Sequence, residues 1–214
     1  SDIVPAAYTR SLSRLQDRVP PRRAAVMRAT IERELGRPIA ELFSSFDDRP
    51  IGAASLAQVH RARLHDGRDV AVKVQYPEVA DLVRLDIRNL KMMVGLVARR
   101  EPNFDYRSIA DEIGRQVPLE VDFVREAEMT ARVARNLAAL PDVTVPRVIE
   151  GYVSRRVLVT EYLEGRRILG EAHLADSSVD ADALAGTIAA AYGDQIPGDR
   201  HFQAEPHPGK ILGL

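Results

Sequence analysis

The spacing of hydrophobic residues changes several times along the chain, and each spacing predicts a different element. Residues 6–44 carry apolar side chains at helical spacing, with a break at Pro20-Pro21 and an end at Gly36. From Pro77 onward a single stripe continues at intervals of three and four residues: Val79, Val83, Ile87, Leu90, Val94 and Val97. These patterns predict a helical N-terminal segment and a long amphipathic helix.

Between these helices the period changes to two. Residues 57–64 and 69–75 alternate between apolar and polar side chains, as half-buried strands do. Asp66-Gly67 between them is a strong signal for a tight turn. We therefore expect an antiparallel hairpin, preceded by a third strand near Phe46–Ile51.

The second half of the chain repeats this change of period. A helix is expected through Ile109 and Ile113, interrupted by Pro118, and another over about residues 119–140. Two further strands are expected within residues 143–153 and 156–162, then a helix over 182–192 and a proline-rich loop. Strands with helices inserted between them indicate an α+β fold, not a repeating βαβ fold.

The composition is that of an ordinary globular protein. The 214 residues are 45% apolar and 29% charged, with a formal net charge of -1, which excludes an intrinsically disordered chain. The lack of cysteine excludes a disulfide scaffold and a cysteine-ligated zinc site. The balanced charge gives no support for a nucleic-acid partner, and no run reaches the ~18 apolar residues of a membrane span.

Two features in the strand region could carry chemistry. The small residues Gly52, Ala53, Ala54 and Ser55 precede a strand, and such a loop allows a ligand to approach the backbone. A tight hairpin packed on a helix explains the same loop. Lys73, one of only three lysines, lies inside the apolar strand Val70–Val74, a pattern typical of the phosphate-binding lysine of protein kinases. An edge-strand lysine that extends to water is the alternative.

Acidic residues form the next candidate group. Asp122 and Glu126 are four residues apart, and Glu120 precedes them. Like charges at this distance repel each other, and water screens that repulsion. A solvated acidic helix face is therefore the usual explanation of such spacing. Glu126 is also well placed to be the helical glutamate that pairs with a kinase strand lysine.

Two later segments complete the set. Glu161, Tyr162 and Leu163 follow an apolar strand, as in the kinase hinge that pairs with adenine. The segment 201–210 is dense in Pro, His and Glu, and includes Glu205 and Lys210. A metal site built from His201, His207 and Glu205 is an alternative, although the spacing matches no helical ligand pair.

Together these segments resemble the UbiB (aarF-domain) family of atypical protein-kinase-like proteins. The resemblance covers nearly the whole chain and rests on four stretches: residues 2–21, the alanine-rich loop Ile51–His60, the Glu-x-Asp segment Leu119–Ala127 and the loop Gln203–Gly209. It implies a protein-kinase-like fold, in which an N-lobe antiparallel sheet carries family-specific inserted helices. It also implies a helical extension over 1–45, an N-lobe over 46–163 and the start of a C-lobe, which we expect to be truncated, over 164–214.

The resemblance also implies roles for the candidate residues. Gly52–Ser55 would cover the phosphates of ATP or ADP, and Lys73 would contact them and pair with Glu126. Glu120 and Asp122 would form the regulatory Glu-x-Asp element, and Glu161–Leu163 the hinge. The implied function is that of an atypical kinase or ATPase supporting isoprenoid-quinone (ubiquinone) biosynthesis. The implied setting is cytoplasmic, at the periphery of a membrane, with quinone-biosynthesis proteins as partners.

Three substitutions depart from the family pattern, the mildest being Gln203 where the resemblance implies a His. Glu205 stands where the resemblance implies a catalytic Asp. The glutamate side chain is one methylene longer, which displaces its carboxylate, and a displacement of about 1 Å can cost on the order of 100-fold in rate. Lys210 stands where a metal-binding Asn is implied, and a cation there would repel Mg²⁺. No Asp-Phe-Gly follows before Leu214. The alternative to an active enzyme is therefore a non-catalytic nucleotide-binding pseudokinase or scaffold.

Overall fold

The computed structural model describes residues 20–99, 106–167, 181–193 and 212–213, which form two compact units. The first unit consists of the described residues up to Ala127 together with Val148–Thr160. The second consists of Glu128–Arg147 and the described residues from Glu161 onward. The first unit contains the sheet, and it is the unit in which most of the candidate residues lie.

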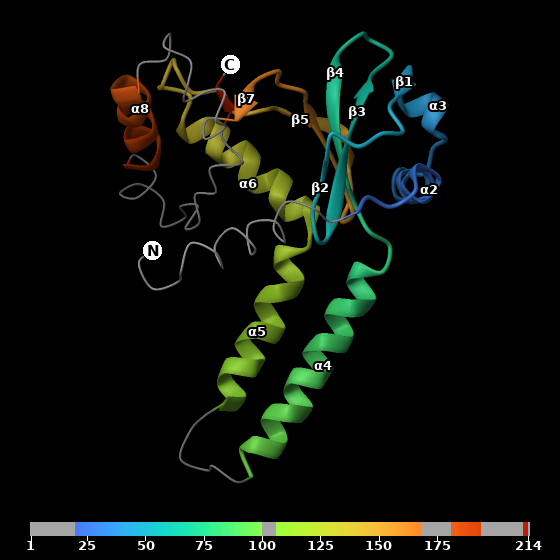
Figure 1. Ribbon diagram of the computed structural model, residues 1–214, viewed down its shortest axis with the longest axis vertical. Helices are drawn as coiled ribbons and strands as arrows, with labels where there is room; N and C mark the ends of the chain where they lie inside the picture. The colour runs from blue at the N-terminus through green and yellow to red at the C-terminus, as the bar shows by residue number, and fades with distance from the viewer. Residues whose placement is uncertain (1–19, 100–105, 168–180, 194–211, 214) are drawn as a thin grey trace, which may run out of the picture. The chain divides into compact units, whose positions relative to one another are not determined.

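The elements follow the order predicted from the hydrophobic pattern (Figure 1). The helices are α2 (Ala24–Leu35), α3 (Ile39–Leu42), α4 (Val79–Val97), α5 (Tyr106–Glu120), α6 (Phe123–Asn136) and α8 (Ala181–Gly193). The strands are β1 (Ser45–Phe46), β2 (Gly52–Ala53), β3 (Ala57–Arg63), β4 (Asp69–Gln75), β5 (Val148–Val153), β6 (Val157–Glu161), β7 (Arg166–Arg167) and β8 (Leu212–Gly213).

Strands β1 to β6 form one sheet, in the order β1-β3-β4-β6-β5, with β2 also paired to β3. The β3–β4 hairpin is the centre of this sheet and is antiparallel from Ala57↔Gln75 to Arg63↔Asp69. Its turn uses Gly67 at φ 91°, a left-handed conformation that glycine adopts without a steric cost. The α+β class and the antiparallel sheet with inserted helices are therefore confirmed.

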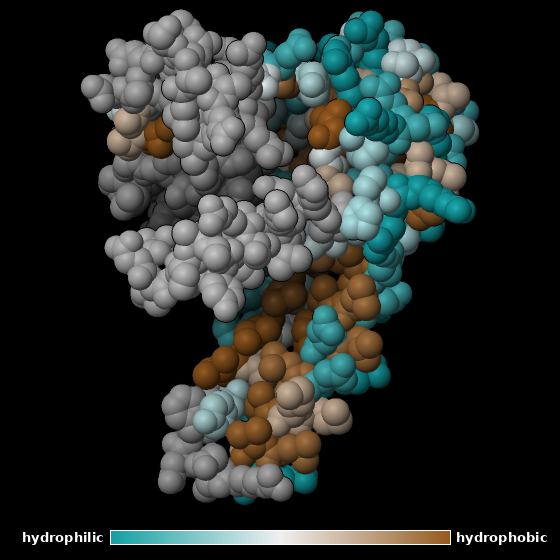
Figure 2. Space-filling view, viewed as in Figure 1, coloured by the Kyte–Doolittle hydropathy of each residue, from teal (hydrophilic) through white to brown (hydrophobic). Residues whose placement is uncertain are grey.

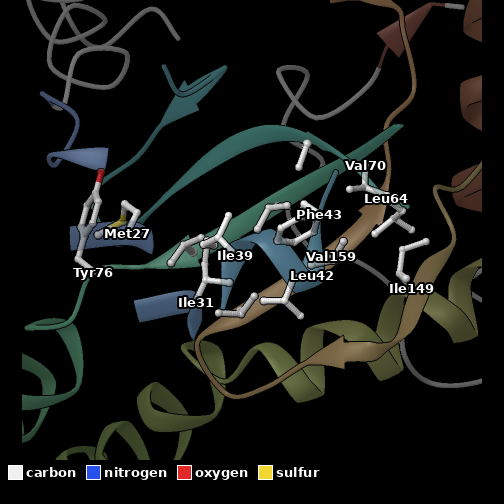
Figure 3. Close-up of a cluster of buried hydrophobic side chains, with 14 of the residues drawn as sticks. Met27, Ile31, Ile39, Leu42, Phe43, Leu64, Val70, Tyr76, Ile149 and Val159 are labelled. Atoms are coloured by element: carbon white, nitrogen blue, oxygen red, sulfur yellow. The ribbon is translucent and has the colours of Figure 1, made fainter. Parts of the chain in front are cut away.

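The period of two along β4 separates the two faces of the sheet. Val70, Val72 and Val74 are buried against the main hydrophobic core, which also includes Met27 and Ile31 of α2 (Figure 3). Leu42 and Phe43, at the end of α3, extend the same core. Helices α2 and α3 therefore cover this face because both present apolar side chains to the valines of β4.

The opposite face of the sheet is covered by the start of α6. Phe123 and Ala127 pack there against Ala57 of β3 and Leu158 of β6, forming a second, smaller cluster. Lys73 and Gln75 alternate with the β4 valines, so they belong to this second face. The start of α6 and the two polar side chains of β4 therefore share one face.

Helices α4 and α5 pack side by side as an antiparallel pair (Figure 1). Lys91 of α4 and Asp111 of α5 join them by an ion pair of 2.7 Å. Several large apolar side chains of the pair remain exposed, among them Leu82, Met92 and Met93. Figure 2 shows hydrophobic residues, in brown, on the visible face of these two helices. Within the described residues, no helix combines the length and the apolar character that crossing a membrane requires.

Within the first unit, the structure differs from the sequence predictions at three places. The strand expected near Phe46–Ile51 is two short strands, β1 and β2, which both pair with β3. Pro118 lies inside α5 and does not interrupt it; the helix continues for two more residues and ends at Glu120. The helix expected over 119–140 begins only at Phe123, after a break at Val121 and Asp122.

The second unit is described by fewer elements. It contains the later part of α6, helix α8 and the short antiparallel pair β7–β8, in which Arg166 lies opposite Gly213. Arg147 and Glu161 also lie in this unit, and the backbone N–H of Glu161 donates to the carbonyl of Arg147 at 2.8 Å. The start of the segment Glu161–Leu163 is therefore tied to the residue that precedes β5.

Candidate functional site

The centre of the candidate site is an ion pair between β4 and α6. The Nζ of Lys73 donates to Oε1 of Glu126 at 2.6 Å and to Oε2 at 2.7 Å. Both residues belong to the first unit, and 53 positions of sequence separate them. The structure therefore brings together the lysine and the glutamate that the kinase-like pattern singled out.

An aromatic ring supports the lysine from a second direction. The Nζ of Lys73 lies 4.6 Å from the centroid of the Phe123 ring, in the first turn of α6, which is a cation–π distance. The side chains of Lys73 and Glu126 remain 33% and 41% exposed, so the pair is not sealed in the core. A lysine ammonium has three donors, so one remains for a ligand after two contacts to Glu126.

The start of α6 is shaped by Asp122. Its Oδ1 accepts a hydrogen bond from the backbone N–H of Val124 at 3.0 Å, which makes Asp122 the N-cap of the helix. Its other carboxylate oxygen lies 3.7 Å from Nε of Arg155. Glu120 ends α5 as an exposed residue. Asp122 and Glu126 are thus not neighbours on one helix face, because Asp122 precedes the helix.

The predicted small-residue loop forms the hairpin between β2 and β3. Gly52 and Ala53 are in β2, and the N–H of Ala54 donates to the carbonyl of Ala57 at 2.8 Å, which leaves Ser55 and Leu56 at the tip. The carbonyl of Leu56 accepts a bond from the N–H of Tyr76 at 2.9 Å, so the tip is tied to the end of β4. A Cβ added at Gly52 would meet no atom within 4 Å, so space does not require glycine there.

The remaining candidates divide between the second unit and the part of the chain outside the described residues. Glu161 accepts a hydrogen bond from the backbone N–H of Arg147 at 3.1 Å and pairs with its Nε at 3.3 Å. Tyr162 and Leu163 follow it and are partly buried. Glu205 and Lys210, like His201 and His207, lie outside the described residues. Among the residues that are described, no group of three His, Asp or Glu side chains could hold a metal ion.

Sequence reasoning missed two residues that the structure places in this site. Phe123 looked like one apolar position of a helix, and nothing in its spacing indicated a contact with Lys73. Gln75 looked like the polar end of a strand, yet it is only 2% exposed and donates from Nε2 to the carbonyl of Val121 at 2.8 Å. A signal did exist for Gln75, since it lies two residues from Lys73 and therefore on the same strand face.

Comparison with known proteins identifies a family model and a solved structure that are similar to this chain. The family model described as "ABC1 atypical kinase-like domain" matches residues 14–213. The solved structure titled "The complex structure of Rv3197-erythromycin from Mycobacterium tuberculosis" matches with a TM-score of 0.77 and 29% identity, over 100% of this chain and 54% of that one. This similarity supports a protein-kinase-like fold.

Curated relatives match over almost the full chain. "AarF domain-containing protein kinase 1" of Gallus gallus is 35% identical over 210 residues, which is 98% of this chain and 40% of that protein. "Protein ACTIVITY OF BC1 COMPLEX KINASE 8, chloroplastic" of Arabidopsis thaliana is 37% identical over 215 residues, covering 98% and 28% respectively. The chain therefore spans less than half the length of these relatives. The match over nearly its whole length shows that the chain belongs to the ABC1 (AarF) family of atypical kinase-like domains.

Proposed function

We propose that this chain binds ATP or ADP as the N-lobe part of an atypical kinase or ATPase. In this proposal, Lys73 contacts the nucleotide phosphates, Glu126 holds Lys73 in place, and the β2–β3 hairpin containing Gly52–Ser55 covers the phosphates. Glu161–Leu163 present backbone groups to the adenine. By family resemblance, the reaction served is the synthesis of an isoprenoid quinone such as ubiquinone.

The observation that carries the proposal is the ion pair between Lys73 and Glu126, at 2.6 Å and 2.7 Å. A lysine in an apolar strand is costly without a partner, and here the partner leaves part of the ammonium accessible. An ammonium oriented in this way suits the charge of a phosphate group. Kinases use the same strand lysine and helix glutamate for that purpose.

A second candidate function is nucleotide binding without phosphoryl transfer. Glu205 and Lys210 favour it, because they replace the Asp and Asn that the family resemblance implies for base and metal ligand. Mg²⁺ bound with the nucleotide would neutralise phosphate charge, and a lysine at the ligand position opposes its binding. A scaffold of this kind would keep Lys73 and Glu126 and would not require metal.

The experiment is titration calorimetry of ATP and ADP, each with and without Mg²⁺. We expect saturable binding by the unmodified chain and a large loss of affinity in Lys73→Ala. Lys91→Ala is the matched control, because it breaks another lysine–carboxylate pair of similar length outside the site. No binding of either nucleotide, or equal affinities for Lys73→Ala and Lys91→Ala, would contradict the proposal.

The same titration separates the two candidate functions. Tighter binding in the presence of Mg²⁺ supports an atypical kinase or ATPase. Affinity that is indifferent to Mg²⁺ supports the non-catalytic alternative. An assay of ATP hydrolysis then tests whether binding leads to phosphoryl transfer.

A further inference from the structure

Gln75 is a buried polar residue that the proposed phosphate contacts do not use. It ends β4, pairs with Ala57 of β3, and its own backbone N–H donates to the carbonyl of Arg156 at 2.9 Å. Its side chain is 2% exposed, and a buried amide is costly unless it is hydrogen bonded. The buried amide of Gln75 therefore requires a hydrogen-bond partner, which the backbone pairing of its strand does not supply.

The partner of its side chain is the break between α5 and α6. Nε2 of Gln75 donates to the carbonyl of Val121 at 2.8 Å. Two residues later the N–H of Phe123 donates to the carbonyl of Arg155 at 3.1 Å, in the turn between β5 and β6. The chain entering α6 is thus held to the sheet at two points, one of which is the Gln75 side chain.

These contacts connect β4 to the start of α6 at two positions around the candidate site. Lys73 and Gln75 are two residues apart on one face of β4, a separation of about 6.6 Å. On the other side, the N–H of Glu126 donates to the carbonyl of Asp122 at 3.2 Å, so Glu126 lies one turn beyond the residue next to Val121. Two side chains of β4 therefore bond to this part of the chain. Gln75 bonds to Val121, just before α6, and Lys73 bonds to Glu126, within α6.

We propose that Gln75 is a positioning residue for the Lys73–Glu126 pair. By holding the carbonyl of Val121, it sets where α6 begins against β4 and hence where the Glu126 carboxylate meets the ammonium. Its role in ligand binding rests on the proposed nucleotide function, whereas its effect on Lys73 does not. Asp122 stabilises the same helix start as its N-cap.

Two variants separate the hydrogen bond from the volume of the side chain. Gln75→Met keeps a long unbranched side chain but lacks a donor, so the carbonyl of Val121 loses its partner. Gln75→Glu is nearly the same shape and lacks a donor when ionised. Gln58→Met is the matched control, because Gln58 is equally buried on the neighbouring strand but bonds to His60 and Arg22 instead.

The first measurement uses no nucleotide. The chain has three lysines, so ¹⁵N-lysine labelling yields few Nζ signals, and Lys73→Arg and Lys91→Arg assign two of them. We expect Gln75→Met and Gln75→Glu to shift the Lys73 signal and leave the Lys91 signal in place. Gln58→Met should leave both unchanged. A Lys73 signal that stays at its original position in both Gln75 variants overturns the proposal.

The second measurement is a double-mutant cycle on ADP affinity. We expect Gln75→Met to weaken binding about tenfold in the unmodified chain and less than about twofold when Glu126→Gln is already present. An equal loss of ADP affinity on Gln75→Met with and without Glu126→Gln would show that Gln75 does not act through Glu126. That result would overturn the positioning role. If the unmodified chain binds no nucleotide, the proposed function fails, and the Lys73 signal alone decides the role of Gln75.

Discussion

Nζ of Lys73 lies 2.6 Å and 2.7 Å from the two carboxylate oxygens of Glu126, although 53 sequence positions separate the residues. The pair joins the central hairpin of the sheet to the first turns of α6. Both side chains are partly open to solvent, at 33% and 41% exposure. Because solvent reaches both side chains, we expect the pair to contribute little to the stability of the fold.

A double-mutant cycle on stability checks that interpretation. We expect Lys73→Met and Glu126→Gln to show a coupling of only about 0.2–1 kcal/mol in the free energy of unfolding, because solvent screens the pair. Urea titration followed by circular dichroism provides the measurement. The cycle with Lys91→Met and Asp111→Asn should show a coupling no larger than this. A coupling of about 3 kcal/mol or more at Lys73 would mark the pair as a buried structural bridge.

The second prediction concerns pH. Burial of His60 lowers the pKa of its imidazole below the ordinary value of 6.5, against opposing contributions from Asp47 and Asp48. The unfolded chain therefore binds the proton more readily than the folded chain between these two pKa values. The contribution of His60 to the free energy of unfolding should be fully present above about pH 6.5. It should be lost as the pH falls through the folded-state pKa.

The variant that tests this is His60→Gln, compared with the unmodified chain by urea titration from pH 8 to pH 5. The loss of stability on acidification should be smaller in the variant, since its titrating group is gone. His65→Gln is the control, because His65 is exposed. An unchanged pH dependence in His60→Gln would show that other groups produce the loss.

Tyr76 provides a third prediction. Its side chain is 1% exposed, and within the described part of the chain its hydroxyl oxygen is buried without a hydrogen-bond partner. Removing an unsatisfied polar atom relieves its desolvation cost, so Tyr76→Phe should raise the free energy of unfolding by about 1 kcal/mol. Tyr152→Phe should have the opposite sign, because that hydroxyl donates to the carbonyl of Leu42 at 3.3 Å. A loss of stability in Tyr76→Phe would reveal a bound water or another partner.

Replacement by alanine should change the stability of the protein in opposite directions at two glycines. Gly36 follows α2 at φ 69°, where its N–H bonds to the carbonyl of Glu32, so Gly36→Ala should cost about 1 kcal/mol of stability. Gly95 lies within α4 and a Cβ there meets no atom within 4 Å. Gly95→Ala should therefore stabilise by about 0.5–1 kcal/mol. Thermal unfolding of the two variants is sufficient, and changes of equal sign would contradict the assignment of Gly36 as the C-cap.

Much of the fold could be predicted because its signals are local. The alternation along 57–64 and 69–75 predicted β3 and β4 to within a residue, since one strand face is buried. The stripe from Val79 to Val97 predicted α4, which begins two residues after the expected start at Pro77. The break at Val121 and Asp122 carried no such signal, because an apolar and an acidic residue suit a helix as well as an interruption.

The sequence by itself determined the β3–β4 hairpin, the long helix α4, and the candidacy of Lys73 and Glu126 through their resemblance to a kinase pattern. The tertiary structure decided how the two meet. It made Asp122 the cap of α6 instead of a neighbour of Glu126 on a helix face, and it paired Gln75 with Val121. The physical reason is range: hydrophobic periodicity acts within one element, whereas the register of α6 on β4 depends on contacts between residues far apart in the chain.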